Sequence, residues 1–176
     1  MRTVILFLDQ TILLEIPPLR AAWAQVGEQA QVPIVGSHKK RILHGALNHG
    51  TGATLLHSSL KWNQEEFQTF LKLVRSKWRG WRIVLFVDKN SAHRAYRSRA
   101  LADQLSIELR WLPTACPELN PLEGLWRVAK NVVLANEATP NMDASLARAC
   151  VYIMSLSPKE RLQKAGVLSG NFWLNT

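Results

Sequence analysis

Two aspartates each follow a short apolar segment that is typical of a buried strand. Asp9 comes directly after Val4–Leu8, and Asp88 comes directly after Ile83–Val87. Continuous apolar runs of this length favour central strands of an α/β sheet that are buried on both faces. Side chains at the carboxyl ends of such strands point into the crevice where these sheets bind ligands. If the two strands are neighbours, the two carboxylates lie close together.

The pairing of these carboxylates indicates a divalent cation site. Two adjacent carboxylates repel each other, and one would keep its proton unless a cation lies between them. Mg²⁺ prefers oxygen ligands and is usually held by one or two carboxylates with water and substrate phosphate. The alternative is that each Asp starts a turn or caps a helix, because its side chain readily bonds the local backbone.

Glu123 is the third candidate, and it also has a structural alternative. Asn120 as N-cap, Pro121 at the first helical position and Glu123 at the third would form a capping box. Asn63 and Glu66 have the same spacing, and no candidate catalytic residue lies near them in the sequence. The spacing by itself therefore does not indicate a catalytic role. From spacing alone, a ligand role for Glu123 stays open.

The elements that must position these residues alternate between strands and helices in the second half of the chain. The first strand is expected to stop at Asp9, residues 15–41 to be irregular, and residues 112–120 to form a loop. Alternation of this kind requires crossover connections, so we expect an α/β fold with a mixed sheet covered on both faces. The other expectations are a hairpin over 42–60, a strand over 107–111, helices over 63–80, 94–105, 121–135 and 143–156, and a short basic tail from Ser157.

Charge and composition limit the class of protein. The 176 residues include 22 Lys and Arg against 13 Asp and Glu, which gives a net charge of +9 and points to a polyanion such as nucleic acid. The length favours one domain over 1–176. Two cysteines are too few for a disulfide scaffold or a zinc ribbon, and no secretory or membrane-spanning segment is evident, so we expect a cytoplasmic protein.

Basic residues near the acidic ones are candidates for contacts to DNA phosphates. Each of them could instead solvate a helix face, and Arg127 could pair with Glu123 four residues earlier. His93 could orient a ligand, contact substrate or be structural. Core packing is expected for most of a set of six tryptophans, with base stacking by one of them as the alternative. The six are Trp23, Trp78, Trp81, Trp111, Trp126 and Trp173. The candidates for DNA contact are Lys39, Lys40, Arg41, His93, Arg94, Arg97, Arg127 and Lys130.

Three segments resemble the catalytic blocks of DDE transposases. Leu112–Trp126 (LPTACPELNPLEGLW) strongly resembles the third block, Val84–Asp88 with His93 resembles the second, and Ile5–Asp9 resembles the first. The similarity is greatest to bacterial insertion-sequence transposases related to the mariner superfamily. The spacing between Asp88 and Glu123 is also characteristic of that group.

The resemblance implies an RNase H-like fold with a five-stranded mixed sheet in which the first and fourth strands lie side by side. It implies that Asp9, Asp88 and Glu123 are the catalytic triad and hold two Mg²⁺ ions, with Mn²⁺ as a substitute. Gln10 and Lys89 depart from the residues usual in relatives, and Lys89 could perturb metal affinity.

The activity implied is cleavage of DNA strands followed by strand transfer during transposition. The implied partners are the element ends and target DNA, with a homodimer assembled on them near the bacterial nucleoid. The first catalytic strand begins at residue 4, so an N-terminal helix-turn-helix region is expected to be absent or on a separate polypeptide. The alternatives are a catalytically silent remnant that binds DNA or a partner, and an RNase H-like nuclease without strand transfer.

Overall fold

A computed structural model of the chain describes residues 2–33, 38–137 and 141–175. Its centre is a five-stranded sheet with the order β3-β2-β1-β4-β5. β1 pairs antiparallel with β2 and parallel with β4, which confirms the mixed sheet and the side-by-side first and fourth strands. The strands are β1 (Thr3–Leu14), β2 (Lys40–Asn48), β3 (Thr54–Ser59), β4 (Arg82–Val87) and β5 (Ile107–Trp111).

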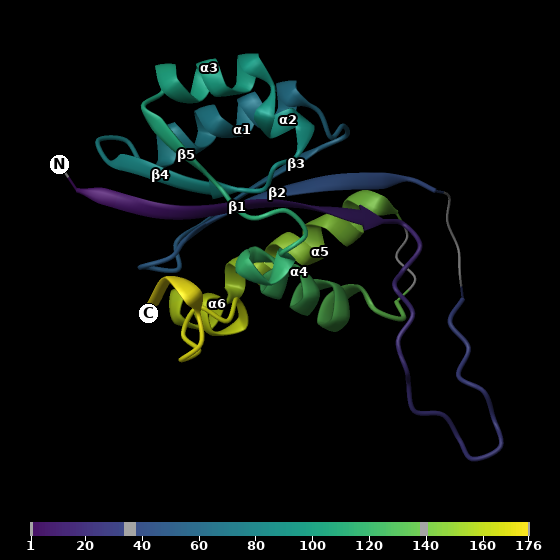
Figure 1. Cartoon of the computed structure of the whole chain (residues 1–176). Coiled ribbons are helices and arrows are strands. Elements are labelled where there is room, and N and C mark those ends of the chain that lie inside the picture. The colour runs from purple at the N-terminus through teal and green to yellow at the C-terminus, as the bar shows by residue number, and fades with distance from the viewer. Residues whose placement is uncertain (1, 34–37, 138–140, 176) are drawn as a thin grey trace.

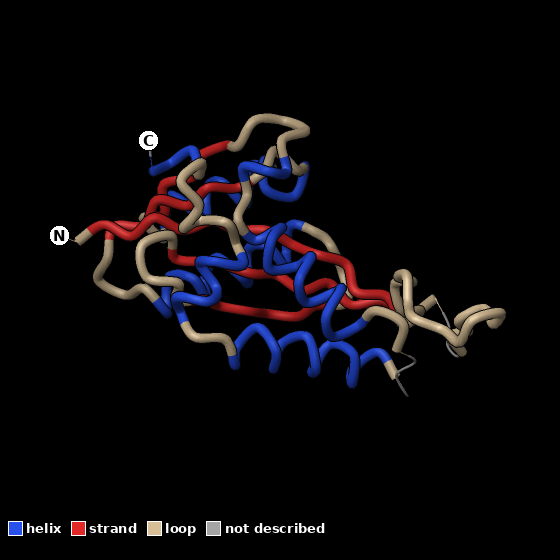
Figure 2. Tube along the Cα trace, turned by 90° about the horizontal axis from the view of Figure 1, so that it is seen from below, coloured by secondary structure: helices blue, strands red, loops and turns tan. Residues whose placement is uncertain are grey.

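Helices cover both faces of this sheet, as the alternation of elements predicts (Figure 1). One face carries α1 (Gln64–Lys77), α2 (Ser91–Arg94) and α3 (Tyr96–Gln104). The other face carries α4 (Leu122–Ala129), α5 (Met142–Ser155) and α6 (Pro158–Lys164), and Figure 2, which views the molecule from below, looks onto this face.

The apolar run of β1 is explained by a core on each side of the sheet. Leu6 and Leu8 pack on the side of α1, whereas Phe7 packs on the side of α4 and α5. Since side chains alternate along a strand, Asp9 faces the α4 side and Gln10 faces the α1 side. Both polar residues are nevertheless buried.

β1 does not stop at Asp9, so that prediction was wrong. The strand continues to Leu14, where it pairs with Lys40 of β2. Its parallel partner β4 is the strand that ends, at Val87. Antiparallel pairing with β2 keeps β1 extended past the point where β4 leaves it, and Asp9 therefore lies within a strand.

The basic tail expected from Ser157 was also wrong, because this segment contains α6. The Ser157 hydroxyl accepts from the backbone of Glu160, whose carboxylate accepts from the backbone of Ser157, which forms a capping box. The buried Arg161 then donates to the carbonyl oxygens of Ile153, Met154 and Gly52, which ties α6 to α5 and to the β2–β3 turn.

Two expected helices are interrupted. The helix expected over 94–105 is broken at Ala95, which separates α2 from α3. The helix expected over 121–135 is α4 followed by a π-helical turn over Lys130–Leu134.

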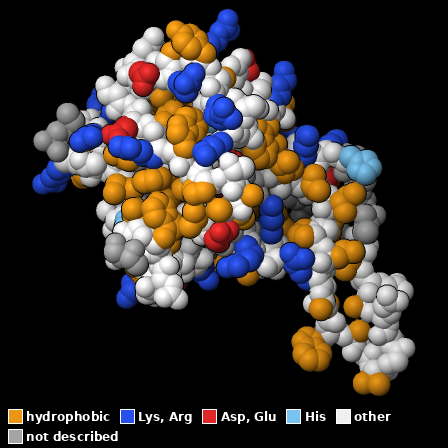
Figure 3. Space-filling view, in the orientation of Figure 1, with side chains coloured by type: hydrophobic (Ala, Val, Ile, Leu, Met, Phe, Trp, Pro, Cys, Tyr) orange, Lys and Arg blue, Asp and Glu red, His pale blue; other side chains and the backbone are white. Residues whose placement is uncertain are grey.

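Residues 15–33 and 38–39 are irregular, and residues 34–37 of this segment lie outside the described residues. Residues 15–20 still contact the body, where Arg20 bonds to Asn131 and Asn136, and the chain beyond them forms an arm that extends away from the body in Figure 3. Trp23 and Val26 are fully exposed on it, so core packing was the wrong expectation for Trp23. Within the residues that the structure describes, no helix combines the length and apolarity needed to cross a membrane.

Candidate active site

The register of β1 against β4 places the two aspartates side by side. The parallel pairing is in register at Phe7 and Phe86, so two residues further along Asp9 lies opposite Asp88, the first residue after β4. Asp9, Asp88 and Glu123 all line the same pocket, together with Lys89, Asn90, Asn120 and the loop over 112–117. We call this the carboxylate pocket.

Asn120 fixes the start of α4 against β1. Its side-chain amide donates to the Leu8 carbonyl oxygen over 2.8 Å, and its Oδ1 accepts from the backbone of Leu122. The backbone N–H of Asn120 already donates to Pro117, so the capping box with Glu123 that spacing suggested does not form. Glu123 is left exposed at the pocket.

Asp9 is nearly buried, and Trp126 of α4 holds it in place. The Trp126 indole Nε1 donates to Asp9 Oδ2 over 2.8 Å. Burial, followed by the negative charges of Glu123 and Asp88, raises the pKa of Asp9 to about 7, although the Trp126 hydrogen bond acts in the opposite direction. The influence of both other carboxylates on Asp9 shows that the three groups interact electrostatically.

Gly45 of β2, the cross-strand neighbour of Asp9, makes room for the indole. A Cβ at this position would lie 2.6 Å from Cη2 and 2.7 Å from Cζ2 of Trp126. A glycine is therefore needed here for the Trp126 ring to reach Asp9.

Asp88 is held by a buried pair of side chains on the other face of the sheet. His93 Nδ1 contacts Asp88 Oδ1 at 2.6 Å, and the backbone of Asn90 donates to the same oxygen. The Gln10 amide Nε2 donates to His93 Nε2 over 2.8 Å, which leaves the ring proton on Nδ1 to be donated to Asp88. Partial burial acts to raise the pKa of Asp88, but the His93 and Asn90 hydrogen bonds outweigh it and hold the pKa below its usual value.

Comparison with known proteins decides the family. The model of the DDE superfamily endonuclease family matches residues 4–144. The chain belongs to this family. It is 25% identical over 144 residues to the "Insertion element IS630 uncharacterized 39 kDa protein" of Shigella sonnei, covering 81% of this chain and 42% of that protein.

Solved structures show the same fold. The Mos1 transposase paired-end complex with the left transposon end matches with a TM-score of 0.73 and 15% identity, over 96% of this chain and 53% of that one. The mariner Mos1 paired-end complex with Mg matches with a TM-score of 0.72 and 16% identity, over 94% of this chain and 52% of that one. The chain thus spans about half the length of these relatives, and the expected RNase H-like fold is confirmed.

The donor set of this DDE domain suits a hard divalent cation, because every candidate ligand is a carboxylate oxygen. Both hydrogen bonds to Asp88 fall on Oδ1, which leaves Oδ2 available. Across residues 2–33, 38–137 and 141–175, no three His, Cys, Asp or Glu side chains are grouped tightly enough to hold an ion by themselves. Mg²⁺ commonly completes its coordination with water and substrate phosphate, so a shared pocket with open positions fits that ion.

The predicted DNA-contact residues fall into three groups. Arg94, with Lys89, lines a hollow beside the carboxylate pocket, and Arg97 is exposed on α3. Lys130 is half-buried at the π-helical turn, where burial lowers its pKa while the charges of Glu123 and Asp9 act against that shift. Lys39, Lys40 and Arg41 lie at the far end of the β1–β2 pair, and Arg41 pairs with Asp143 at 2.8 Å.

For two of these candidates the structure removes one of the alternative roles. His93 is only 1% exposed, so it does not face DNA and instead positions Asp88. Arg127 is exposed on α4, and no ion pair joins it to Glu123 in the part of the chain that the structure describes. The charge of Arg127 therefore remains available for a phosphate.

Sequence reasoning missed four residues of the site: Gln10, Gly45, Asn120 as a tether to β1, and Trp126 as a donor to Asp9. Gln10 and Gly45 lie in segments compared with the family, but no sequence pattern indicates their contacts, because these depend on strand register. Trp126 follows Glu123 by three residues, so the two side chains lie close together on the helix. This spacing is the signal that could have indicated that Trp126 contacts the site.

Proposed function

We propose that the chain is the catalytic domain of a transposase, which cleaves DNA strands and transfers the freed ends. The observation that carries this proposal is that Asp9, Asp88 and Glu123, distant in sequence, line one pocket. The family match and the similarity to the Mos1 complex with a transposon end support it.

The proposed metal requirement rests on the same three carboxylates and on the Mos1 complexes that contain Mg and Mn. Two divalent ions would be held by Asp9, which is buried, Asp88, which is half-exposed, and Glu123, which is exposed. When bound, they would activate the attacking oxygen and neutralise charge on the leaving oxygen of an in-line displacement at phosphorus.

The reaction would proceed in two displacements. In the first, water attacks a phosphodiester, its oxygen joins phosphorus, and the P–O3′ bond breaks to leave a 3′-hydroxyl and a 5′-phosphate. In the second, that 3′-hydroxyl attacks a target phosphodiester, and another P–O3′ bond breaks as the new one forms.

The residues of this chain would act by positioning rather than by covalent attack. Trp126 fixes the rotamer of Asp9, and His93 with Gln10 fixes that of Asp88. Basic side chains around the pocket would hold the DNA backbone by charge, in a way that depends steeply on salt.

The proposed partners are DNA, comprising element ends and target, and a second copy of the chain assembled on that DNA. A DNA-binding region on a separate polypeptide, the extent of the domain over 1–176 and nucleoid association stay predictions. Each follows from the proposed reaction and needs its own test.

A nicking assay tests the proposal directly. Wild-type protein with Mn²⁺ should nick supercoiled DNA, and Asp88→Ala should not. Equal nicking by both proteins would mean that the activity comes from a contaminant, which would contradict the proposal and favour a catalytically silent remnant. One observation supports that alternative, because no three His, Cys, Asp or Glu side chains of the described residues form a closed metal site. Joining of a pre-cleaved end then separates a transposase from a nuclease that does not transfer strands.

A further inference from the structure

A second hollow adjoins the carboxylate pocket and is lined by a different set of side chains. We call it the basic pocket. It shares Lys89 and Thr114 with the carboxylate pocket, so the two are continuous along one surface. Its lining residues are Lys89, Arg94, Arg99, Trp111 and Thr114.

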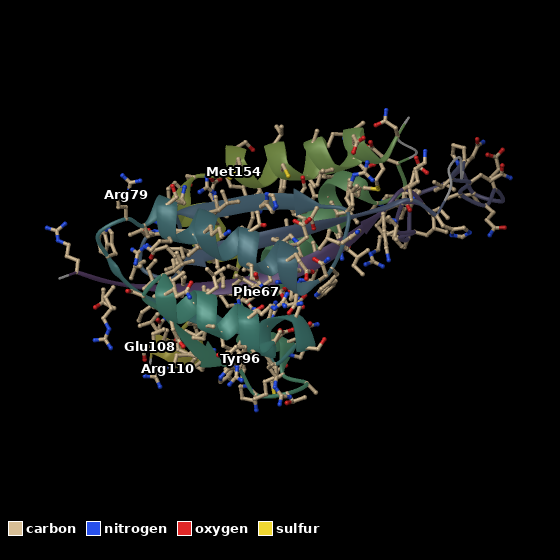
Figure 4. The ribbon with its side chains drawn as sticks, turned by 90° about the horizontal axis from the view of Figure 1, so that it is seen from above. Phe67, Arg79, Tyr96, Glu108, Arg110 and Met154 are labelled. Atoms are coloured by element: carbon tan, nitrogen blue, oxygen red, sulfur yellow. The ribbon has the colours of Figure 1, made fainter. Side chains whose placement is uncertain are left out.

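The basic pocket gathers positive charge that no carboxylate neutralises. In the described ranges of the chain, Lys89, Arg94 and Arg99 form no ion pair. Nearby arginines behave differently, because Arg82 and Arg110 both pair with Glu108, which lies beside Arg110 at the edge of β5 in Figure 4. Three unpaired cations around one hollow repel one another, and an anion bound there would relieve that repulsion.

The break between α2 and α3 brings two of these cations together. Positions five residues apart on one continuous α-helix point about 140° away from each other. Arg94 ends α2 and Arg99 lies within α3, and the extended ψ of 138° at Ala95 redirects the chain between them. The interruption therefore allows both side chains to line the same pocket.

Trp111 gives the basic pocket an aromatic wall. It is the last residue of β5 and is 36% exposed, whereas Trp78 and Trp126 are buried. A partly exposed indole beside unpaired cations is the arrangement with which proteins stack an unpaired base and hold its phosphate.

We propose that the basic pocket holds one unpaired nucleotide of the DNA strand next to the phosphodiester at the three carboxylates. Its phosphate lies against Lys89, Arg94 and Arg99, and its base stacks on Trp111. A base that remains paired in a duplex cannot present its face to an indole, so the ligand is single-stranded at this point. This inference rests on the proposed function, because it assigns the path of the same substrate.

The test is DNA binding without divalent metal, measured by fluorescence anisotropy over a series of salt concentrations. The probes are a dye-labelled single-stranded oligonucleotide and a duplex of the same sequence. Trp111→Leu should weaken single-strand binding by about 5- to 150-fold and change duplex binding less than about two-fold. Trp111→Phe should retain most of the affinity, which separates loss of stacking from misfolding.

The charge contribution is read from the salt dependence. The double variant Arg94→Ala/Arg99→Ala should make the slope of log K against log salt shallower by about 1.4 for the single strand, about 0.7 for each lost phosphate contact. Arg79→Ala is the matched control, because Arg79 is an exposed arginine away from both pockets (Figure 4) and should change neither quantity.

Three results would overturn the inference. Trp111→Leu could lose single-strand and duplex affinity equally, it could lose no affinity, or the double variant could keep the salt slope of the wild type. Failure of the proposed function looks different. Wild-type protein would then bind single strands through the basic pocket but would not nick DNA with Mn²⁺.

Discussion

The Trp126 indole donates a hydrogen bond to Asp9 Oδ2 over 2.8 Å, and this bond joins two residues 117 positions apart in sequence. Trp126 lies on the same helix as Glu123, so the bond links the strand that carries one candidate ligand to the helix that carries another. The charges of Glu123 and Asp88 both raise the pKa of Asp9, so Asp9 interacts electrostatically with each of the other two carboxylates.

Trp126→Phe should destabilise the metal-free protein more at pH 8 than at pH 5. The indole stabilises the ionised form of Asp9, which predominates only above its pKa of about 7. When this donor is lost Asp9 can keep its proton, so the extra fall in the free energy of unfolding at pH 8 is limited to about 1.4 kcal/mol, the cost of protonating Asp9 one pH unit above its pKa. Urea unfolding measures this difference. Trp78→Phe, at a buried indole of the α1 core, should cost the same at both pH values.

Gly45→Ala should displace the Trp126 ring, because the added Cβ would lie 2.6 Å from Cη2. Overpacking of this kind costs about 1–3 kcal/mol of unfolding free energy, and nicking should fall with it since Asp9 loses its donor. Gly170→Ala is the control, because nothing lies within 4 Å of the Cβ position there. If Gly45→Ala matched Gly170→Ala in both stability and nicking, the assigned role of Gly45 would be refuted.

Asp9 should make the metal-free protein less stable as the pH rises. Its pKa is about 7 in the folded protein against 3.8 in the unfolded chain, so the folded state binds more protons between these values. Stability from this group is greatest below pH 4 and is lost as the pH rises towards 7, on the order of 4 kcal/mol. Asp9→Asn should remove this contribution, so the stability of the variant relative to wild type should rise with pH over this range, as pH-dependent denaturant unfolding would reveal. Identical pH profiles for wild type and Asp9→Asn would rule this out.

His44 should contribute the opposite slope. The pKa of this buried imidazole is lowered to about 4 by burial and by His57 and His93, against 6.5 in the unfolded chain. The unfolded state therefore binds more protons between pH 4 and 6.5, and stability is lost as the pH falls through that window, on the order of 3 kcal/mol.

Because the contributions of Asp9 and His44 oppose each other between pH 4 and 6.5, wild-type stability should vary little with pH there. In the same experiment His44→Gln should show a fall of stability with rising pH, whereas Asp9→Asn should show a rise. Parallel profiles for the two variants would contradict the assignment.

His93→Asn should lower nicking by about 10- to 100-fold, mainly by raising the Mn²⁺ concentration required, since side chains that orient metal ligands typically have effects of this size. Titration of nicking with Mn²⁺ separates this effect from a loss of maximal rate. His57→Asn is the matched control, because His57 contacts Glu66 and does not line the carboxylate pocket. An equal effect of both variants would indicate a merely structural role for His93.

The order of elements was predictable because apolar runs and helical periodicity are local. β4, β5, the hairpin and α1 follow such patterns, and the resemblance of Leu112–Trp126 to a catalytic block identified Glu123. The end of β1 was not predictable, because Asp9 breaks the apolar run while pairing with β2 continues to Leu14. The helix α6 does carry a local signal, because Ser157, Pro158 and Glu160 form a capping-box pattern, but the helix is short and Arg161 holds it to distant carbonyl oxygens.

The sequence predicted which carboxylates are candidate ligands, but it did not predict the side chains that hold them in position. Spacing left Glu123 open between a capping box and a ligand. The backbone N–H of Asn120 is bonded to Pro117, which excludes the capping box, and the ligand role stays a prediction. The role of His93 was left open between orienting a ligand, contacting substrate and a structural one, and its position against Asp88 depends in part on Gln10, which lies 83 positions away. Trp111 was expected in the core, although its place at the end of an edge strand leaves it partly exposed.

The central claim is that Asp9, Asp88 and Glu123 share divalent cations while DNA is bound. The most direct measurement is anomalous scattering from a crystal of the protein with DNA and Mn²⁺. The account predicts manganese density in the carboxylate pocket, bonded to oxygens of Asp9 and Asp88 and within reach of Glu123. Density elsewhere, or an empty pocket in crystals whose protein nicks DNA with Mn²⁺ in solution, would contradict it.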